Sequence, residues 1–525
     1  MATTIEEKEV TVFGEEEAKQ LVNELRVAYD SGRTRSYSWR VAQLKNILRM
    51  CDDSEKEVVE ALHKDLAKPE LESTLYERDN TGGRQLANIG VLYLMKWGDA
   101  VVGSALQLGM IKNACKVALK ELKNWIRPEK AKTSLTTFPS SAEIVSEPFG
   151  VILIISAWNY PFCRFMLSID PVIGAIAAGN AVLLKPSELA PASSSLLAKL
   201  FAQYLDTCSI KVVEGAVSET SALLEQKWDK IMYTGNGRVG RIVMAAAAKH
   251  LTPVIMELGG KCPVVVDSDI NLQVAVRRLI AGKWGCNNGQ ACISPDYILT
   301  TKDYAPKLVD ALKTELEKFY GKNQLESKDL SRIVNSNHFA RLSKLLEDEK
   351  VSGKIVYGGE RDKDKLRIAP TILLDVLRDS LIMNEEIFGP LLPILTLNNI
   401  DESFNVINSG TKPLAAYIFT NNKKLKEKFV MSVSAGGIVI NDTTIHMAVH
   451  TVPFGGVGES GMGSYHGKFS FDAFSHKKAV VYRSFTGDAA LRYPPYTGFK
   501  LRMMKALMGG SFLAILRALF GGSKS

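Results

Sequence analysis

Short apolar runs alternate with longer helical patterns between residues 150 and 260. The run Val151–Ile155 is continuously apolar, as expected of a strand that is buried on both faces of a sheet. The same reasoning predicts further strands over 181–184, 210–213, 230–233 and 254–256, a helix that ends near Ala178 and another over 191–205. Strands separated by helices indicate right-handed crossovers and a parallel sheet.

The alternation resumes after Lys261. It predicts strands over 264–266 and 297–300 and helices over 272–283 and 304–319. Before residue 130 the chain is mainly helical, with amphipathic candidates over 15–29 and 55–67. We therefore predict an α/β fold with two Rossmann-like open parallel-sheet domains, a ligand cleft between them and a small bridging element.

These patterns suggest domain boundaries. We expect two α/β domains. Bridging or oligomerisation segments and a C-terminal tail complete the chain. The first domain comprises residues 1–130 and 151–257, and the second comprises residues 258–440. The bridging or oligomerisation segments are residues 131–150 and 441–485, and the tail is residues 489–525.

The tail has an unusual composition. After Asp488 there is no acidic residue, whereas six Lys and Arg residues occur. Between them, Ala506–Leu516 carries no charge, but a helix that spans a bilayer needs about 20 apolar residues. Two interpretations stay open: peripheral binding to an anionic membrane surface, or docking of a tail helix on the protein itself or on a partner subunit.

Composition limits the class of protein. The chain has 525 residues, of which 46% are hydrophobic and 23% charged, as is typical of a globular protein with more than one domain. The net charge of +8 is modest, and no dense basic run interleaved with aromatic residues indicates nucleic-acid binding.

The cysteine content and the N-terminus bear on location. Seven scattered cysteines without a C-x-x-C pair argue against a disulfide framework and a structural metal site. The acidic N-terminus argues against a secretory or mitochondrial targeting segment. We expect a cytoplasmic protein, or one bound peripherally to endomembranes, and not a secreted one.

Cys292 is the candidate nucleophile, because Gly289 and Gln290 place it on a flexible loop. A thiol attacks as the thiolate, so its pKa of about 8.5 must be lowered or a base must take the proton. Glu257, in the segment Glu257–Lys261, is a carboxylate that could act later on water. Cys286 is either structural or a resolving thiol for an oxidised Cys292.

A glycine-rich stretch, Gly235–Gly240, has the spacing G-x-G-x-x-G and lies between a predicted strand and a helix that runs to Ala248. Such a loop and the following helix N-terminus suit a pyrophosphate. By spacing alone, Glu257 would then bind the adenosine ribose, a role for which Lys185 and Glu188 compete because they follow the strand over 181–184 directly.

Five motifs in a fixed order resemble the aldehyde dehydrogenase superfamily, and the resemblance runs from about residue 15 to 480. The motifs are Trp158–Pro161, Lys185–Glu188, Glu257–Lys261, Asn287–Cys292 and Glu385–Pro390. Three further segments, Phe454–Gly456, Tyr465–Gly467 and Ser470–His476, are similar to the class 3 branch of fatty and aromatic aldehyde enzymes. The context Gly282–Tyr297 resembles plant members of that branch.

The resemblance implies that residues 1–130 with 151–257 form an NAD(P)-binding domain and residues 258–440 the catalytic domain. It also implies a role for each motif. Cys292 attacks the aldehyde carbon, the Asn159 amide and the Cys292 N–H hold the oxyanion, and Glu257 activates the water that hydrolyses the thioester. In the cofactor site, Lys185 and Glu188 bind the adenosine ribose, the loop with Gly235 and Gly240 binds the pyrophosphate, and Glu386 binds the nicotinamide ribose. Phe388 packs beside the nicotinamide ring, and Trp158 is a further cofactor-binding residue. Arg238 departs from the small hydroxylated residue that is more usual in this glycine-rich loop.

We thus expect NAD(P)-dependent oxidation of medium-chain, long-chain or aromatic aldehydes to carboxylic acids, without a metal. A carboxylate at the ribose favours NAD, while NADP stays possible. The branch implies a homodimer, and often a C-terminal extension that sets membrane location. The alternatives are a thiol esterase or acyl-transfer enzyme that uses Cys292 without a nucleotide, and a membrane-tethered binding protein.

Overall fold

The computed structural model describes residues 13–68, 105–134, 137, 140–162, 167–486 and 488–520. The chain divides into two compact units. One comprises Met1–Glu121 with Pro148–Phe474, and the other comprises Leu122–Glu147 with Ser475–Ser525. Both α/β sheets belong to the first unit.

The first sheet has the strand order β17-β7-β6-β3-β4-β5. Its strands are β3 (Val151–Ile155), β4 (Ala181–Lys185), β5 (Ile210–Val212), β6 (Lys230–Gly235), β7 (Val254–Leu258) and β17 (Gly461–Met462). The first five run parallel, which confirms the predicted strands and their direction. β17 was not predicted, because two residues leave no alternation to detect. It pairs antiparallel with β7 and places Gly461 opposite Glu257.

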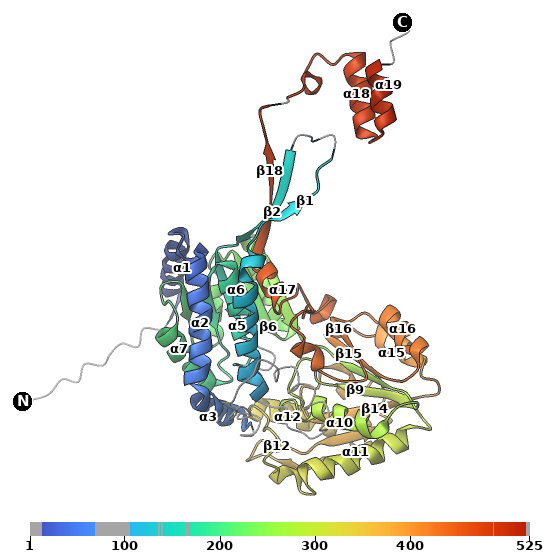
Figure 1. The fold of residues 1–525 in the computed structure, drawn as a ribbon. Helices are drawn as coiled ribbons and strands as arrows, with labels where there is room; N and C mark the ends of the chain where they lie inside the picture. Colours follow the sequence, from blue (N-terminus) through green and yellow to red (C-terminus); the bar gives the residue numbers. More distant parts are fainter. Residues whose placement is uncertain are drawn as a thin grey trace, which may run out of the picture. The chain divides into compact units, whose positions relative to one another are not determined.

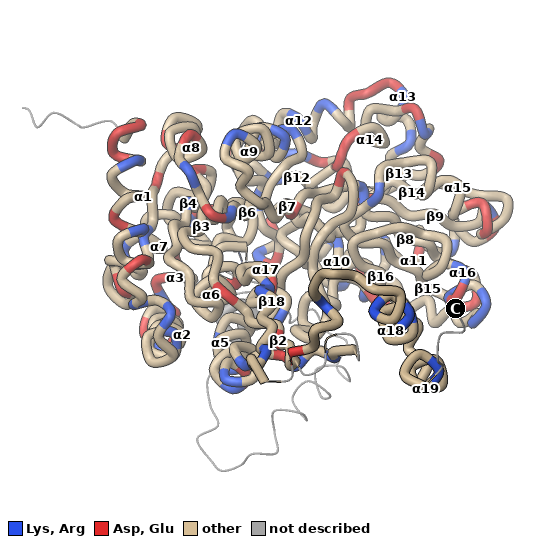
Figure 2. The backbone as a smooth tube through the Cα atoms, turned by 90° about the horizontal axis from the view of Figure 1, so that it is seen from above, with Lys and Arg blue, Asp and Glu red and all other residues tan. Residues whose placement is uncertain are grey.

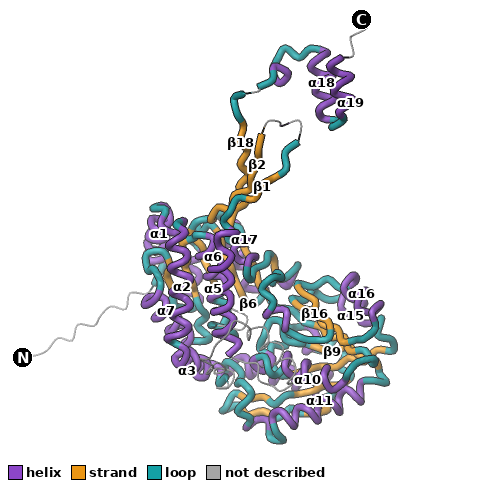
Figure 3. The backbone as a smooth tube through the Cα atoms, viewed as in Figure 1, coloured by secondary structure: helices purple, strands orange, loops and turns teal. Residues whose placement is uncertain are grey.

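Helices flank this sheet (Figure 1). They are α1 (Glu15–Asp30), α2 (Tyr37–Asp53), α3 (Glu55–Leu66), α5 (Ala105–Trp125), α6 (Ile169–Ala178), α7 (Pro191–Tyr204), α8 (Val217–Leu224) and α9 (Gly237–Lys249). The apolar face of α1 supplies Ala18, Val22 and Leu25 to the core beneath the sheet, as its amphipathic pattern predicted. The helices α1, α6, α7 and α9 contact strands of the sheet. The helix α2 packs on α6 and α7, and α3 packs on α7 (Figure 3).

The second sheet has the order β10-β13-β14-β9-β8-β15-β16. Its strands are β8 (Pro263–Val266), β9 (Tyr297–Thr301), β10 (Ile355–Tyr357), β13 (Thr371–Leu374), β14 (Leu391–Leu397), β15 (Ala415–Phe419) and β16 (Gly437–Ile440). Only the edge strand β10 runs antiparallel among them. Around it lie α10 (Leu272–Lys283), α11 (Ala305–Tyr320), α12 (Ser336–Glu347), α13 (Glu349–Ser352), α14 (Leu381–Asn384), α15 (Glu402–Asn408), α16 (Lys423–Ser432) and the hairpin of β11 (Arg361–Asp362) and β12 (Arg367–Ile368).

The second unit contains a three-stranded sheet of order β1-β2-β18, formed by β1 (Glu129–Ala131), β2 (Ser140–Pro148) and β18 (Ser475–Arg483). Its C-terminal part forms α18 (Gly498–Met508) and α19 (Phe512–Phe520), which pack on each other through Met503, Ala506 and Ala518. Gly510, with φ +66°, lies between them. The uncharged stretch of the tail is therefore shared by two short helices.

The two tail helices carry Lys and Arg but no Asp or Glu (Figure 2). Within the described ranges, no helix combines the length and the apolar character that crossing a bilayer requires.

Candidate active site

The Cys292 loop begins with a 3₁₀ turn over Asn287–Gly289. Asn288 and Gly289 have φ of +51° and +81°, conformations that Asn tolerates and Gly adopts freely. A Cβ on Gly289 would lie 2.1 Å from the carbonyl oxygen of Gly389, so only glycine allows the two loops to approach this closely. The small residues of the motif thus serve packing between the Cys292 loop and the loop of Glu386.

The Gln290 side chain fixes this loop. Its Nε2 donates to the carbonyl oxygens of Asn287 (3.1 Å) and Arg332 (2.9 Å), and its Oε1 accepts from the Val334 N–H (3.0 Å). Because the side chain is fully buried, these bonds fix the backbone two residues before Cys292.

Glu257 lies on β7 with only 1% of its surface exposed. Burial raises the pKa of its carboxyl to about 7, and the Cys292 thiol lowers that pKa in part. Neither carboxylate oxygen has a hydrogen-bond partner among the described residues. The carboxyl is thus a buried group beside the thiol, able to exchange a proton near neutral pH.

Cys292 itself is 7% exposed. Burial, followed by the charge of Glu257, raises the pKa of its thiol well above the ordinary value. The thiol therefore does not ionise unaided. Of the two routes considered from the sequence, a lowered pKa or a neighbouring base, burial opposes the first, and the Glu257 carboxyl lies beside the thiol.

Asn159 approaches the same loop from the other sheet. Its Nδ2 donates to the carbonyl oxygen of Gln290 at 3.1 Å, and its own carbonyl accepts from Asn287 Nδ2 at 3.3 Å. An amide nitrogen carries two hydrogens, so one remains to donate to a ligand beside Cys292. The structure therefore brings Asn159, Glu257 and Cys292 together.

Glu386 lies against the backbone that follows β7. A Cβ on Gly259 would meet its Oε2 at 2.0 Å, and the Gly260 N–H lowers the pKa of its carboxyl. Burial and the charge of Asp296 outweigh that contact and raise the pKa to about 8. Glu257 also raises it, which places both carboxyls in one electrostatic environment.

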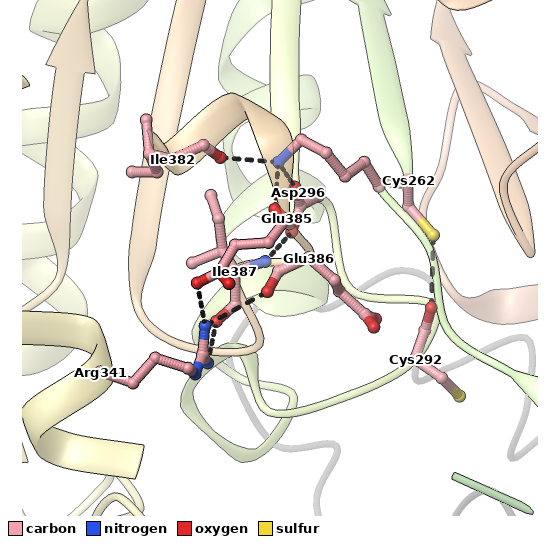
Figure 4. Close-up of polar contacts among 9 residues, drawn as sticks. Cys262, Cys292, Asp296, Arg341, Ile382, Glu385, Glu386 and Ile387 are labelled. Atoms are coloured by element: carbon pink, nitrogen blue, oxygen red, sulfur yellow. Dashed lines mark hydrogen bonds and ion pairs between the residues drawn. The ribbon is translucent and has the colours of Figure 1, made fainter. Parts of the chain in front are cut away.

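Asp296 and Lys261 hold the Glu386 loop (Figure 4). Asp296 Oδ1 accepts from the Ile387 N–H at 2.9 Å, and its other oxygen pairs with the Lys261 ammonium. Lys261 Nζ also donates to the carbonyl oxygens of Ile382 and Glu385, each at 2.9 Å. This network sets the backbone from which Glu386 projects.

Phe388 and Trp158 form an aromatic cluster. Their rings pack edge to face, with centroids 5.5 Å apart, and Trp158 packs in the same way on His338 at 5.4 Å. Phe388 has φ +49°, an uncommon conformation for an aromatic residue.

Lys185 ends β4, at the carboxyl edge of the first sheet, and its Nζ is 3.0 Å from Glu188 Oε2. Lys185 is buried, whereas the Glu188 side chain is 41% exposed. A buried cation and an accessible carboxylate at this edge suit the hydroxyls of a nucleotide ribose, since open parallel sheets bind ligands there.

Gly235 ends β6, and α9 begins two residues later. The Asn236 side chain accepts from the Val239 N–H at 3.0 Å, so it satisfies one of the free N–H groups at the helix start. A Cβ on Gly240 would approach Leu258 Cδ2 to 3.0 Å, so glycine lets α9 pack closely on β7. The remaining N–H groups fit an anion such as pyrophosphate.

Sequence reasoning missed several residues that the structure assigns to this site. Cys262 Sγ donates to the Cys292 carbonyl oxygen at 3.3 Å (Figure 4). Lys68 and Asp296 bind backbone groups around Asn159 and Glu386. None of the three lies at a spacing that predicts a long-range contact, so the sequence held no signal for them. Cys286 is buried, with its sulfur 4.0 Å from Thr444 Oγ1.

The fold and the site define an α/β enzyme with a buried thiol, a neighbouring carboxyl and a nucleotide-binding sheet edge. Residues 86–480 match the model of the aldehyde dehydrogenase family, and the chain belongs to that family.

Similar proteins of known name support the same family assignment. The chain is 67% identical to aldehyde dehydrogenase family 3 member H1 of Arabidopsis thaliana over 97% of this chain and 99% of the relative. It is 44% identical to a dimeric NADP-preferring aldehyde dehydrogenase of Rattus norvegicus, over 90% of this chain and 97% of the relative. A substrate-bound AldH structure from Staphylococcus aureus superposes with a TM-score of 0.84 at 39% identity, over 93% and 99% of the two chains. The chain is thus a plant-like class 3 aldehyde dehydrogenase that oxidises aldehydes to acids with NAD(P).

Proposed function

We propose that Cys292, Glu257 and Asn159 carry out this oxidation. The observation that supports the assignment best is the meeting of the Cys292 thiol with the buried Glu257 carboxyl, each of which shifts the pKa of the other. The thiol proton passes to Glu257 while the sulfur attacks the aldehyde carbon and forms a C–S bond. The carbonyl oxygen becomes an oxyanion, to which the Asn159 amide and the Cys292 N–H donate.

The oxidised nicotinamide nucleotide supplies the hydride acceptor, after which the acyl group is a thioester of Cys292. Glu257 releases its first proton, takes one from water, and the hydroxide attacks the thioester carbon. The C–S bond breaks, the carboxylic acid leaves, and the thiolate is reprotonated. A pKa of about 7 makes both forms of Glu257 available at neutral pH, as a general base requires.

We propose cofactor-binding residues as well, supported by their places at the carboxyl edge of the first sheet and in the Glu386 loop. Lys185 and Glu188 take the adenosine ribose, and the backbone from Gly235 to Gly240 takes the pyrophosphate. Glu386 takes the nicotinamide ribose, with Phe388 and Trp158 beside the ring. The exposed Glu188 carboxylate would repel a 2′-phosphate, so we favour NAD. The relative from Rattus norvegicus is named an NADP-preferring enzyme, so we retain NADP as a second cofactor in the proposal.

The substrate preference is for medium-chain, long-chain or aromatic aldehydes, supported by the likeness to the class 3 branch. NADH formation is measured with hexanal and longer aldehydes for wild type and Cys292→Ala. We expect Cys292→Ala to lose the activity and Cys208→Ala, which removes an exposed thiol, to retain it. Equal activity of Cys292→Ala and wild type would overturn the proposal.

We further propose that residues 1–130 and 151–257 form the nucleotide-binding domain and residues 258–440 the catalytic domain. Support comes from the two sheets, since each range holds the strands of one of them, apart from the short β17. Residues 131–150 and 441–485 would join a homodimer. The name of the rat relative and the largely exposed strand β18 support that role.

The tail, residues 489–525, binds peripherally to an anionic membrane surface. The pair α18 and α19 exposes large apolar side chains beside basic ones. The apolar residues are Phe499, Leu501, Met504, Met508, Phe512, Leu513, Leu519 and Phe520, and the basic residues are Lys500, Arg502, Lys505 and Arg517. Each basic residue near an anionic surface contributes about 1 kcal/mol. The protein is then cytoplasmic or bound to endomembranes.

Liposome flotation tests the tail. We expect wild type to float with phosphatidylserine vesicles and a chain truncated after Asp488 to stay in solution. A variant with the four basic residues of α18 and α19 replaced by Gln separates charge from apolar contact and should bind more weakly. Equal flotation of truncated and full-length protein would reject membrane binding through the tail.

A further inference from the structure

Lys68 is a fully buried cation near the proposed oxyanion site. It follows the C-terminus of α3 by two residues, after Ala67 in a left-handed conformation with φ +48°. Its side chain has 0% exposure, and its Nζ donates to the carbonyl oxygen of Asn159 at 3.1 Å. The same Nζ lies 4.0 Å from the centre of the Tyr160 ring, within range of a cation–π contact.

The end of α3 also contacts the segment that supports the Cys292 loop. The N–H of Arg332 donates to the Leu66 carbonyl oxygen at 3.0 Å, and its guanidinium donates to the Asp65 carbonyl oxygen at 3.0 Å. The Arg332 carbonyl oxygen in turn accepts from Gln290 Nε2 at 2.9 Å. Residues 65–68 therefore connect by hydrogen bonds to both groups that would hold the oxyanion, Asn159 and the Cys292 backbone.

We propose that Lys68 is a positioning residue for the oxyanion site. The inference rests on the proposed role of Asn159. An ammonium group is costly to bury, so it persists only where hydrogen bonds and ring contacts replace its water. The Asn159 carbonyl accepts from both Lys68 and Asn287, which fixes its peptide plane and the direction of its side chain. A donor must stay within a few tenths of an ångström of the developing charge to stabilise it.

Lys68→Met tests the proposal, because methionine fills similar space without a charge or a donor. We expect kcat to fall about 10- to 100-fold, while KM for the nucleotide changes less than about twofold. Alkylation of Cys292 by iodoacetamide should keep its wild-type rate, since it forms no oxyanion. Lys64→Met, which removes an exposed charge from the last turn of α3, is the matched control and should behave as wild type.

A double-mutant cycle separates positioning from general support of the fold. Asn159→Ala alone should lower kcat about 10²- to 10³-fold. Adding Lys68→Met to that variant should not lower kcat further, because Lys68 acts through Asn159. An equal further loss in the double variant, or a wild-type kcat for Lys68→Met, would overturn the inference. A wild-type kcat for Asn159→Ala would instead overturn the proposed function.

Lys68→Gln provides a second route if the methionine variant does not fold. It retains an N–H donor but not the charge, so its kcat should lie between those of Lys68→Met and wild type. When Lys68→Gln is combined with Asn159→Ala, kcat should again fall no further than in Asn159→Ala alone. An additive loss of kcat would contradict the positioning role.

Discussion

Cys262 donates its thiol hydrogen to the carbonyl oxygen of Cys292 over 3.3 Å, so one buried cysteine supports the backbone of another. Burial raises the pKa of the Cys262 thiol far above its ordinary range, which keeps it a hydrogen donor. Cys262→Ala should lower the free energy of unfolding by about 1–3 kcal/mol and kcat several-fold, because the carbonyl loses its partner. Thermal melts and NADH formation measure both effects. Cys208→Ala, at an exposed site, should change neither, and an unchanged Tm for Cys262→Ala would contradict the prediction.

Activity should follow the ionisation of Glu257. Its pKa of about 7 means that the basic form is scarce at pH 6 and predominant at pH 8. We expect kcat to rise through this window when hydrolysis of the thioester limits turnover. Glu257→Gln should slow both the acylation of Cys292, followed as the burst of NADH, and the hydrolysis of the thioester, and should lose this pH dependence. A wild-type pH profile in Glu257→Gln would show that another group acts as the base.

The ionisation of Glu257 should also make the folded protein less stable as the pH rises, although it makes the enzyme more active. The carboxyl pKa is about 7 in the folded protein and near 4.5 when unfolded, so the folded state binds more protons between these values. The free energy of unfolding therefore falls as pH rises from 4.5 to 7, by up to about 3 kcal/mol. Glu257→Gln, which cannot ionise, should melt higher than wild type at pH 8 and no higher at pH 4.5. A constant difference in Tm across this range would refute the burial argument.

Glu188 should govern the choice of nucleotide. Its side chain is 41% exposed and pairs with Lys185 at 3.0 Å, so it can turn towards ribose hydroxyls. Glu188→Gln should raise KM for NAD about tenfold, through loss of a charged hydrogen bond, and should lower KM for NADP. Steady-state kinetics with both nucleotides give the comparison, with kcat expected to change little. Glu214→Gln, a carboxylate bonded to Ser195, is the surface control. A parallel rise in both KM values would argue against repulsion of the 2′-phosphate.

Much of the fold could be predicted because its strands are buried on both faces. Val151–Ile155 and the first four residues of β4, Ala181–Leu184, are continuous apolar runs, which leave a signal in the sequence. β17 has two residues and β10 has three, so neither has a detectable period. The break between α18 and α19 was missed because Gly509 and Gly510 were included in one uncharged stretch.

The site was predictable where a motif holds the reacting group itself. Cys292, Glu257 and Asn159 meet in space although 133 positions separate the first and the last of them in the sequence (292 − 159). What the sequence could not show is the support around them. Lys68 reaches Asn159 across 91 positions and Cys262 reaches Cys292 across 30, and each does so through a backbone carbonyl. Every residue has such a carbonyl, so no side-chain pattern marks the partner.

Asp296 should be the critical support of the Glu386 loop. It pairs with Lys261 and accepts from the Ile387 N–H at 2.9 Å, and only 3% of it is exposed. Asp296→Ala leaves the Lys261 ammonium and the Ile387 N–H without this partner. For a buried pair, such a loss lowers the free energy of unfolding by about 3–5 kcal/mol. We expect a Tm lower by several degrees and a higher KM for the nucleotide, because Glu386 and Phe388 lose their fixed backbone. Asp379→Ala, which breaks the exposed pair with Lys350, should cost less than about 1 kcal/mol. Equal losses in the two variants, or an unchanged KM in Asp296→Ala, would mean that the loop is held by the Arg341 bond to the Ile387 carbonyl oxygen instead.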